Sequence, residues 1–201
     1  MKNLVSILAL VFIVMQLSTK PVEAEPYQQF AARMVASGQF RADIEKLVFQ
    51  KLNAYRASQG RAPLAFEPSL TFGARAHAQD MATHGFMGHR SSHGDDFSSR
   101  MSALIPNRGQ LPDMGENAAD TVMTGLSADA IAEKLTQMWI HSAGHRFNMV
   151  SRNFTKVAVG VAIVGNKAYG DQLFQGPPPV SLLGLPLAGQ QSMEQKTDRL
   201  Y

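Results

Sequence analysis

Apolar residues recur at intervals of three and four in three stretches of the chain, with polar residues between them. The stretches run from Arg41 to Gly60, from Pro68 to His84 and from Ser127 to Gly144, which is expected to break the last one. Such spacing places the apolar side chains on one face of a helix. The three predicted helices have the apolar faces Ile44, Leu47, Val48 and Tyr55; Leu70, Ala74, His77 and Met81; and Ile131, Leu135, Met138 and Trp139.

Weaker signals lie between the second and third helices. Asp95 or Asp96 is a candidate N-cap for a short helix that Pro106 ends, with Phe97, Met101 and Leu104 on its apolar face. The segment 107–124 is rich in Asn, Gly, Pro and Asp, and it is expected to be mostly irregular.

The segment Lys156–Val164 alternates β-branched residues with smaller ones, which is typical of a strand. The pair Gly165-Asn166 favours a tight turn, so residues 168–174 are expected to return as the second strand of a hairpin. A short extended piece is also predicted between Pro63 and Pro68. Helices that precede a hairpin indicate an α+β domain in which helices cover a small sheet.

Both ends of the chain differ from this pattern. Residues 1–24 have the positive start, apolar run and small residues of a secretory signal peptide, with cleavage expected after Ala24 and no membrane span in the mature chain. Residues 25–40 are interpreted as a linker or a short leading helix. The Pro-rich segment 176–201 is predicted to be disordered or loosely draped, since three consecutive prolines cannot enter a sheet. We therefore expect a secreted or periplasmic protein with one domain over residues 41–175.

Composition limits the class of protein. The 201 residues include 19 Lys and Arg, 16 Asp and Glu, and no Cys. The positive surplus is small and forms no basic run, so nucleic acid is not expected as a partner. Without cysteine the domain has no disulfides, and its core must hold the fold alone.

All six histidines lie between residues 77 and 145, beside glycines and a Gly-Glu-Asn sequence. Imidazoles and a carboxylate can bind a metal ion or transfer protons, so this region predicts a polar cavity. His77, on an apolar helix stripe, is interpreted as a hydrogen-bonded core residue. His89 follows a helix end and is a site candidate, whereas His84 and His93 are interpreted as solvated loop residues. Glu116 is placed in a loop, and composition does not decide whether it faces the histidines.

The sequence from His141 to His145 has the four-residue spacing of a zinc-binding H-E-x-x-H helix. Ser142 takes the place of the Glu, and Gly144 interrupts the helix, so the sequence disfavours a metalloprotease site here. A Ser142–His145 nucleophile pair lacks a recognisable orienting acid and oxyanion hole. The favoured interpretation is that the Ser142 hydroxyl closes the helix, whose C-terminal dipole favours a protonated His145.

Several motifs in a fixed order resemble the CAP superfamily of cysteine-rich secretory, antigen 5 and pathogenesis-related proteins, and more closely its bacterial SCP-like extracellular branch. The resemblance covers residues 44–174 and depends on motifs spread over that whole range. They are Leu52-Asn53-Ala54-Tyr55-Arg56, Pro63-Leu64, residues 74–82, His89, Gly115-Glu116-Asn117, residues 139–148 and Val159-Gly160-Val161-Ala162.

The resemblance implies an α-β-α sandwich with a small central antiparallel sheet and a cleft lined by His and Glu. Eukaryotic members hold two His and two Glu there and can bind a divalent metal. His89 and Glu116 match the first of each, but Ser142 and Tyr169 stand where the second Glu and second His are expected. The bacterial pattern offers His145 opposite His89. His89, His145, Glu116 and a water would make a zinc shell, or a hydrogen-bond network without metal, with Asn117 nearby.

The resemblance fixes no single chemistry, so three functions stay open. The first is a secreted binding module whose His/Glu-lined cleft takes a small ligand, a lipid or a cell-envelope component. The second is a hydrolase in which Glu116 and the histidines activate water, with or without a metal such as zinc. The third is a structural extracellular protein whose polar cluster holds the fold together. The lack of a recognisable nucleophile favours the first and third.

Overall fold

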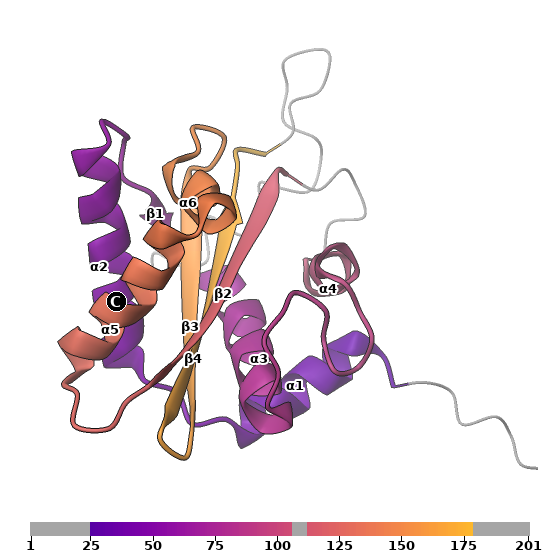
Figure 1. The fold of residues 1–201 in the computed structure, drawn as a ribbon. Helices are drawn as coiled ribbons and strands as arrows, with labels where there is room; N and C mark the ends of the chain where they lie inside the picture. The colour runs from indigo at the N-terminus through magenta and orange to yellow at the C-terminus, as the bar shows by residue number, and fades with distance from the viewer. Residues whose placement is uncertain (1–24, 106–111, 179–201) are drawn as a thin grey trace, which may run out of the picture.

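A four-stranded sheet stands at the centre of the protein, with helices on both of its faces (Figure 1). The computed structural model describes residues 25–105 and 112–178, so the predicted signal peptide and nearly all of the predicted tail lie outside the described residues. No helix in the described ranges is long and apolar enough to cross a membrane. In chain order the elements are α1 (Tyr27–Ser37), α2 (Ala42–Ser58), β1 (Ala65–Phe66), α3 (Pro68–His84), α4 (Phe97–Leu104), β2 (Met114–Val122), α5 (Ala128–His141), α6 (Ala143–Val150), β3 (Lys156–Val164) and β4 (Lys167–Gln175).

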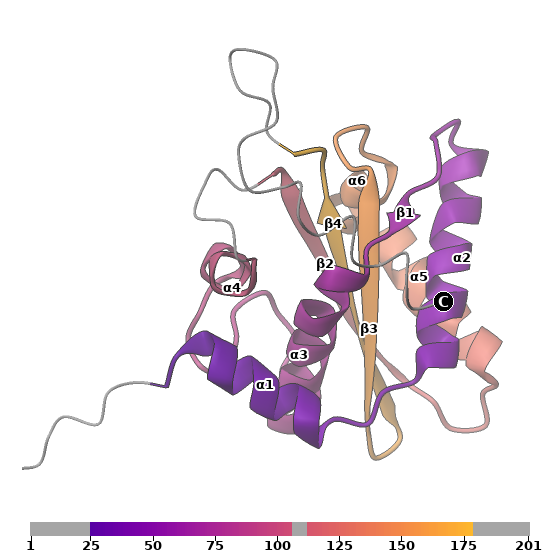
Figure 2. The ribbon, with the colours of Figure 1, turned by 180° about the vertical axis from the view of Figure 1, so that it is seen from behind.

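The strands lie in the order β1-β3-β4-β2. The three long strands pair antiparallel, whereas the two-residue strand β1 runs parallel to β3. The sheet is therefore mixed, and the expectation of an antiparallel sheet holds for its long strands. Helices α2, α5 and α6 cover one face, and α3, flanked by α1 and α4, covers the other, as the view from behind also shows (Figure 2). This arrangement is the predicted α+β sandwich.

The two sides of β3 explain how the layers pack. Its valines, at positions 157, 159 and 161, belong to the apolar core shared with α2 and α5. Its small residues, Ala158, Gly160 and Ala162, face α3. A Cβ built on Gly160 would lie only 2.4 Å from the Ala74 carbonyl carbon in α3, so glycine is what lets this helix approach the strand.

The predicted helices and hairpin are confirmed, with the expected N-caps of α4 and α5 and the expected end of α3. Ser127 accepts from the Ala130 N–H at the start of α5, and Asp96 accepts from the Ser99 N–H at the start of α4. Gly85 ends α3 with φ of 66°, a left-handed conformation that glycine adopts without strain. Of the two interpretations of residues 25–40, the structure shows a helix, since α1 packs its buried residues Tyr27, Phe30, Ala31 and Met34 toward α3 and α4.

The prediction that residues 107–124 are mostly irregular is wrong. Nine of them form β2, which pairs along its whole length with β4 and places Glu116 opposite Leu173. Gly, Asn and Asp are depleted in strands, so propensity gave no sign of it. Burial against β4 and the helices outweighs propensity here, because Gly115, Glu116, Asn117, Ala118 and Ala119 are all buried.

Candidate functional site

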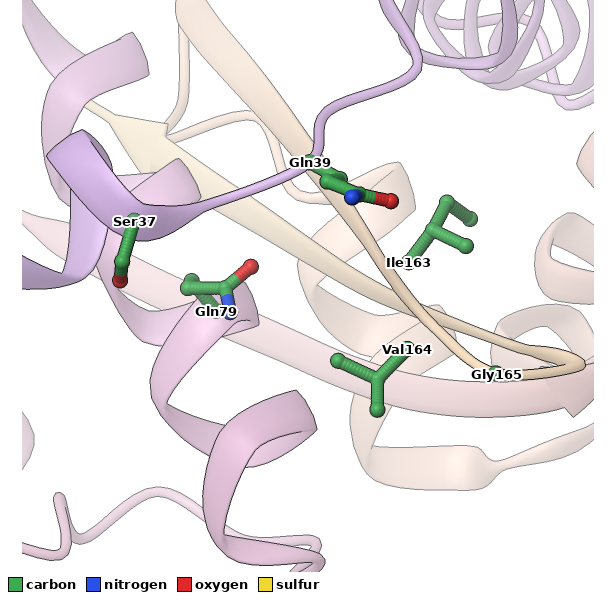
Figure 3. A pocket seen from close by; sticks show the side chains of 6 residues that line it. All are labelled: Ser37, Gln39, Gln79, Ile163, Val164 and Gly165. Carbon is green, nitrogen blue, oxygen red and sulfur yellow. The ribbon is translucent and has the colours of Figure 1, made fainter.

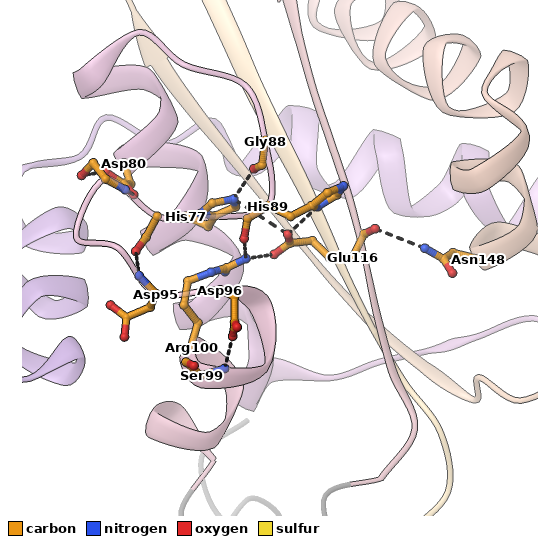
Figure 4. Close-up of polar contacts among 12 residues, drawn as sticks. His77, Asp80, Gly88, His89, Asp95, Asp96, Ser99, Arg100, Glu116 and Asn148 are labelled. Atoms are coloured by element: carbon orange, nitrogen blue, oxygen red, sulfur yellow. Dashed lines mark hydrogen bonds and ion pairs between the residues drawn. The ribbon is translucent and has the colours of Figure 1, made fainter.

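The Glu116 carboxylate is the centre of a polar cluster between β2 and α3, although sequence reasoning had placed this residue in a loop. Its side chain is only 2% exposed and has a separate partner for each oxygen. Oε1 lies 2.8 Å from His89 Nδ1, and Oε2 accepts from Arg100 Nη2 at 2.5 Å (Figure 4). Strand alternation turns Glu116 to the α3 face of the sheet, where these partners lie.

Two anchors fix the loop that carries His89. Arg100 Nη2 also donates to the His89 carbonyl at 3.0 Å, so one guanidinium holds both the loop and the carboxylate. In α3 the buried Asp80 carboxylate accepts from the Ser92 N–H at 2.9 Å. The His89 ring is therefore positioned by Glu116 in β2, and the loop that carries it is held by Arg100 in α4 and Asp80 in α3.

His77 is buried and hydrogen-bonded, as its place on the apolar stripe predicts. Its Nε2 lies 2.8 Å from the Gly88 carbonyl and 3.8 Å from Glu116 Oε1. The carbonyl can only accept, so Nε2 carries the proton. Burial lowers the pKa of His77 and outweighs the attraction of Glu116, which keeps this imidazole neutral.

The charge states of Glu116 and His89 follow from their contact. Burial opposes ionisation of Glu116, but the His89 hydrogen bond and the Arg100 charge outweigh it and lower the pKa of Glu116. An ionised carboxylate only accepts, so His89 donates through Nδ1–H. The same hydrogen bond raises the pKa of His89. Glu116 thus fixes the orientation of the ring and leaves Nε2 on the side away from the carboxylate (Figure 4).

Asn117 belongs to the opposite face of the sheet and brings α6 to the site. Its Nδ2 donates to Gln172 Oε1 at 3.0 Å and to the His145 carbonyl at 3.1 Å. Asn148 in α6 donates through Nδ2 to Asn117 Oδ1 and to the Glu116 carbonyl. Glu116 and Asn117, which are consecutive in β2, therefore hold the two histidines. The Glu116 carboxylate contacts the ring of His89, and the Asn117 side chain donates to the backbone carbonyl of His145.

The rings of His89 and His145 pack edge to face, with their centroids 6.2 Å apart. The structure therefore brings His89, Glu116 and His145 together from segments that lie far apart in the chain. His145 is in the first turn of α6, and not at the end of α5 as predicted, because the break falls at Ser142 and Gly144 lies inside α6. Burial and the neighbouring His89 lower the pKa of His145, in place of the expected dipole stabilisation of its charge.

The remaining predicted site residues do not join this group. Ser142 ends α5, but its hydroxyl makes no capping hydrogen bond, which contradicts the predicted closing role. Tyr169 packs in a cluster with Ala78, Met81, Ala162 and other apolar residues, and no hydrogen bond joins it to His89, Glu116 or His145. His141 is exposed and lies 2.7 Å from the Gln137 carbonyl.

The expectation that His84 and His93 are solvated is confirmed for His84 and wrong for His93. His84 is exposed at the end of α3, 2.8 Å from Asp80 Oδ1. His93 instead packs against Phe30 at 5.0 Å between ring centroids and contacts the Asp95 carboxylate, so α1 partly covers it.

Two ionisable residues with no exposed area, Arg100 and Asp171, were missed from the sequence. Arg100 is fully buried, and it lies on the same helical face as Phe97, Met101 and Leu104, a periodicity that could have revealed it. Asp171 in β4 is also fully buried, and neither of its oxygens has a hydrogen-bond partner in the structure. Burial raises the pKa of Asp171 well above its usual range, so this carboxyl is held neutral. No pattern in the β4 sequence distinguishes Asp171 from a solvent-facing residue.

The residues present do not fit a divalent metal held by His89, His145 and Glu116. Both Glu116 oxygens are already engaged, one of them by a guanidinium that repels a cation. Ser142 and Tyr169, at the two positions where the family pattern has ligands, contribute nothing to the group. Within residues 25–105 and 112–178, no three His, Cys, Asp or Glu side chains are arranged to hold a metal ion.

Two hollows are described on the surface, and neither is lined by these histidines. One, of about 250 Å³, lies beside the β3–β4 turn and is lined by Ser37, Gln39, Gln79, Ile163, Val164 and Gly165 (Figure 3). The other, of about 300 Å³, lies between α2 and α3 and includes Phe49, Phe66 and the Glu45–Arg75 ion pair. Neither hollow therefore coincides with the predicted His/Glu-lined cleft. His89, Glu116 and His145 instead form a cluster of convergent side chains.

The fold agrees with what comparison with known proteins shows. The model of the cysteine-rich secretory protein family, CAP, matches residues 49–175, which is more than half of the chain. The chain belongs to this family. The resemblance inferred from the motifs is thus confirmed, and the matched range includes all of the site residues.

The chain is similar to several proteins of known sequence or structure, among them an extracellular protein and an outer surface protein of bacteria. The chain is 33% identical over 123 residues to the uncharacterized protein YkwD of Bacillus subtilis (strain 168), covering 61% of this chain and 44% of that protein. An extracellular protein containing a SCP domain from Bacillus anthracis str. Ames aligns with a TM-score of 0.53 and 22% identity, over 67% of this chain and 40% of that one. An outer surface protein of Borrelia burgdorferi aligns with a TM-score of 0.56 and 15% identity, over 69% and 98%. The chain thus spans less than half of the first two proteins.

Proposed function

We propose that this chain is an extracellular binding module, which takes a small ligand, a lipid or a cell-envelope component on the surface formed by His89 and His145. The observation that carries the proposal is the convergence of the two rings, 6.2 Å apart, on a rigid support. Convergent polar groups held by a scaffold are typical of a recognition site. The bacterial surface and extracellular proteins that share the fold support the location.

The geometry supports binding better than hydrolysis. A general base must accept a proton near neutral pH, but the lowered pKa of Glu116 keeps it an ionised acceptor bound to Arg100. Within the described ranges no hydroxyl or thiol donates to His89 or His145, so no activated nucleophile accompanies the rings. The exposed side chains of Met87 and Phe147, close in sequence to the two histidines, instead offer apolar area for contact with a partner.

Retention on isolated bacterial envelopes tests this function. The full chain and its His89→Ala/His145→Ala double variant are incubated with envelope fractions, and the bound protein is measured after washing. We expect the double variant to lose most of the retention. His141→Ala is the matched control, because it removes an exposed histidine from the end of α5, and it should bind as the unchanged chain does. Equal retention of the folded double variant and the control would overturn the proposal.

A further inference from the structure

We infer that the hollow between α2 and α3 is the docking site of an apolar segment of the chain's own C-terminal tail, residues 182–187. The described residues end at 178, so this segment lies beyond them. The hollow lies by β1 at one edge of the sheet, whereas His89 and His145 lie by β2 at the other edge. The inference therefore goes beyond the proposed function and does not depend on it.

The lining of this hollow is largely apolar. Phe66 in β1 is 50% exposed, and its ring packs edge to face against Phe49 in α2 with the centroids 5.9 Å apart. Of the charged residues that line the hollow, Glu45 and Arg75 are bound to each other at 2.6 Å, and Lys46 is exposed at the rim. A half-exposed aromatic pair in a hollow, beside an ion pair that is already neutralised, suits an uncharged apolar partner.

The tail leaves the domain close to this hollow, since β1 and the end of β4 lie at the same end of the sheet (Figure 2). The Gln175 carbonyl accepts from the Thr155 N–H at 2.9 Å, and the Thr155 carbonyl accepts from the Ala65 N–H of β1 at 2.9 Å. Neighbouring strands are about 4.8 Å apart, so the tail starts about 10 Å from β1. Leu182 comes seven residues after Gln175. Seven extended residues span about 23 Å, which is enough to reach Phe66.

The sequence of the tail supplies a matching segment. Residues 182–187 read Leu-Leu-Gly-Leu-Pro-Leu and have no charge, whereas the charged residues of the tail all come later, in 190–201. Burying leucine side chains against phenylalanine rings is favourable, because it removes apolar area from water. The hollow has a volume of about 300 Å³, the low end of the range for ligand pockets, which suits a few side chains of a peptide.

Tethering favours this segment over a separate partner. A segment joined to the domain by a short flexible linker meets its site at an effective concentration in the millimolar range. A free lipid, or a second copy of the chain, has to compete with that concentration for the same apolar surface. The chain's own leucines are therefore the occupant that the position of the hollow favours.

Disulfide cross-linking in the full chain tests the inference, because the chain has no Cys of its own. One variant combines Gly184→Cys, between the leucines, with Thr71→Cys in the lining of the hollow. The matched control combines Gly184→Cys with Arg152→Cys. Arg152 is exposed and close to the start of the tail, since a Cβ on Gly176 would lie 2.8 Å from the carbonyl oxygen of Asn153. A tail without a preferred site would therefore cross-link to the control position first.

Under a mild oxidant we expect the disulfide to Thr71→Cys to form about tenfold faster than the one to Arg152→Cys, because docking raises the local concentration of the tail at the hollow. Adding Leu182→Ser/Leu185→Ser should abolish the preference and leave the rate with Arg152→Cys unchanged. Both serines lie outside the described elements, so they leave the packed core intact. The aromatic ring signals of Phe66 should move in the same two-serine variant of the cysteine-free chain.

Three results would overturn the inference. The first is a rate with Arg152→Cys equal to or above that with Thr71→Cys, or a preference that survives the two serines, which would reflect the reach of the tail alone. The second is cross-linking that joins two chains and rises with protein concentration, which would assign the hollow to a second copy. The third is a Phe66 signal that responds to added oleate and not to the two serines, which would assign the hollow to a lipid.

Discussion

On the face covered by α2, α5 and α6, the sheet presents valines, Phe174 and Ala168 to a continuous apolar core. On the face covered by α3, it presents alanines and glycine along β3, and Glu116 and Asp171 from the two strands beyond it. The first face is stabilised by apolar burial, whereas the second includes an ion pair that has little access to water. This difference explains the position of the site. Close approach of α3 to small residues leaves room at the side for charged groups, and α4 then closes over them.

The largest effect is expected from breaking the buried ion pair. Arg100→Met leaves Glu116 buried without its cation and should lower the free energy of unfolding by about 3–5 kcal/mol. Urea denaturation measures this loss. The double variant Arg100→Met/Glu116→Leu should recover most of it, because no uncompensated charge remains. Arg41→Met is the matched control: its pair with Asp43 is exposed, so a cost of about 1 kcal/mol or less is expected. An equal cost for Arg41→Met and Arg100→Met would show that burial of the Arg100–Glu116 pair does not matter.

On the apolar face, the corresponding test is a substitution that creates a cavity in the core. Leu135 in α5 is fully buried in the core, so Leu135→Ala should lower the free energy of unfolding by about 2–5 kcal/mol. The slope of the urea transition should stay unchanged. The ring signals of His89 should also keep their positions, since Glu116 and Arg100, which hold this histidine, lie on the other face of the sheet. Shifted His89 signals in Leu135→Ala would show that the two faces are not independent.

The link between the faces is Asn117. Asn117→Ala removes the contacts to Gln172, Asn148 and the His145 carbonyl and should cost about 1–3 kcal/mol. Unlike Leu135→Ala, it should also move the ring signals of His145, because α6 loses its anchor to β2. Thermal unfolding and histidine spectra of the same sample check both expectations. Unaltered His145 signals beside lowered stability would mean that α6 is held by packing alone.

The smallest expected effect is on the pH dependence of stability. The contact with Glu116 raises the pKa of His89 above 6.5 in the folded state, so the folded state binds the proton more tightly than the unfolded state does. The stability that His89 contributes is therefore fully present below the unfolded pKa and is lost as pH rises through the folded pKa. Comparing His89→Gln with the unchanged chain by urea denaturation at several pH values should show a difference at acidic pH that shrinks at alkaline pH. A difference that grows with pH would contradict the donor role of His89.

Sequence reasoning recovered the elements whose residues follow a regular period. Helix α5 and the β3–β4 hairpin show such periods, and the structure confirms them. Sequence reasoning missed strand β2 because Gly115, Glu116 and Asn117 have low strand propensity. Packing and hydrogen bonds, which the sequence pattern does not show, hold them in the strand. The meeting of His89 and His145 came from family resemblance, since spacing alone gave no sign of it. Arg100 was overlooked because an arginine is almost never fully buried unless it is paired, and its partner lay in an unrecognised strand.

An ionised, buried Glu116 orients His89 toward His145. Long-range proton–nitrogen correlation spectra of the histidine rings in the folded full chain detect this orientation. We expect His89 to keep its proton on Nδ1 near neutral pH, and Glu116→Gln to shift this nitrogen signal while leaving that of His141 in place. A His89 ring with the proton on Nε2 alone, or one that does not respond to Glu116→Gln in a folded variant, would contradict it.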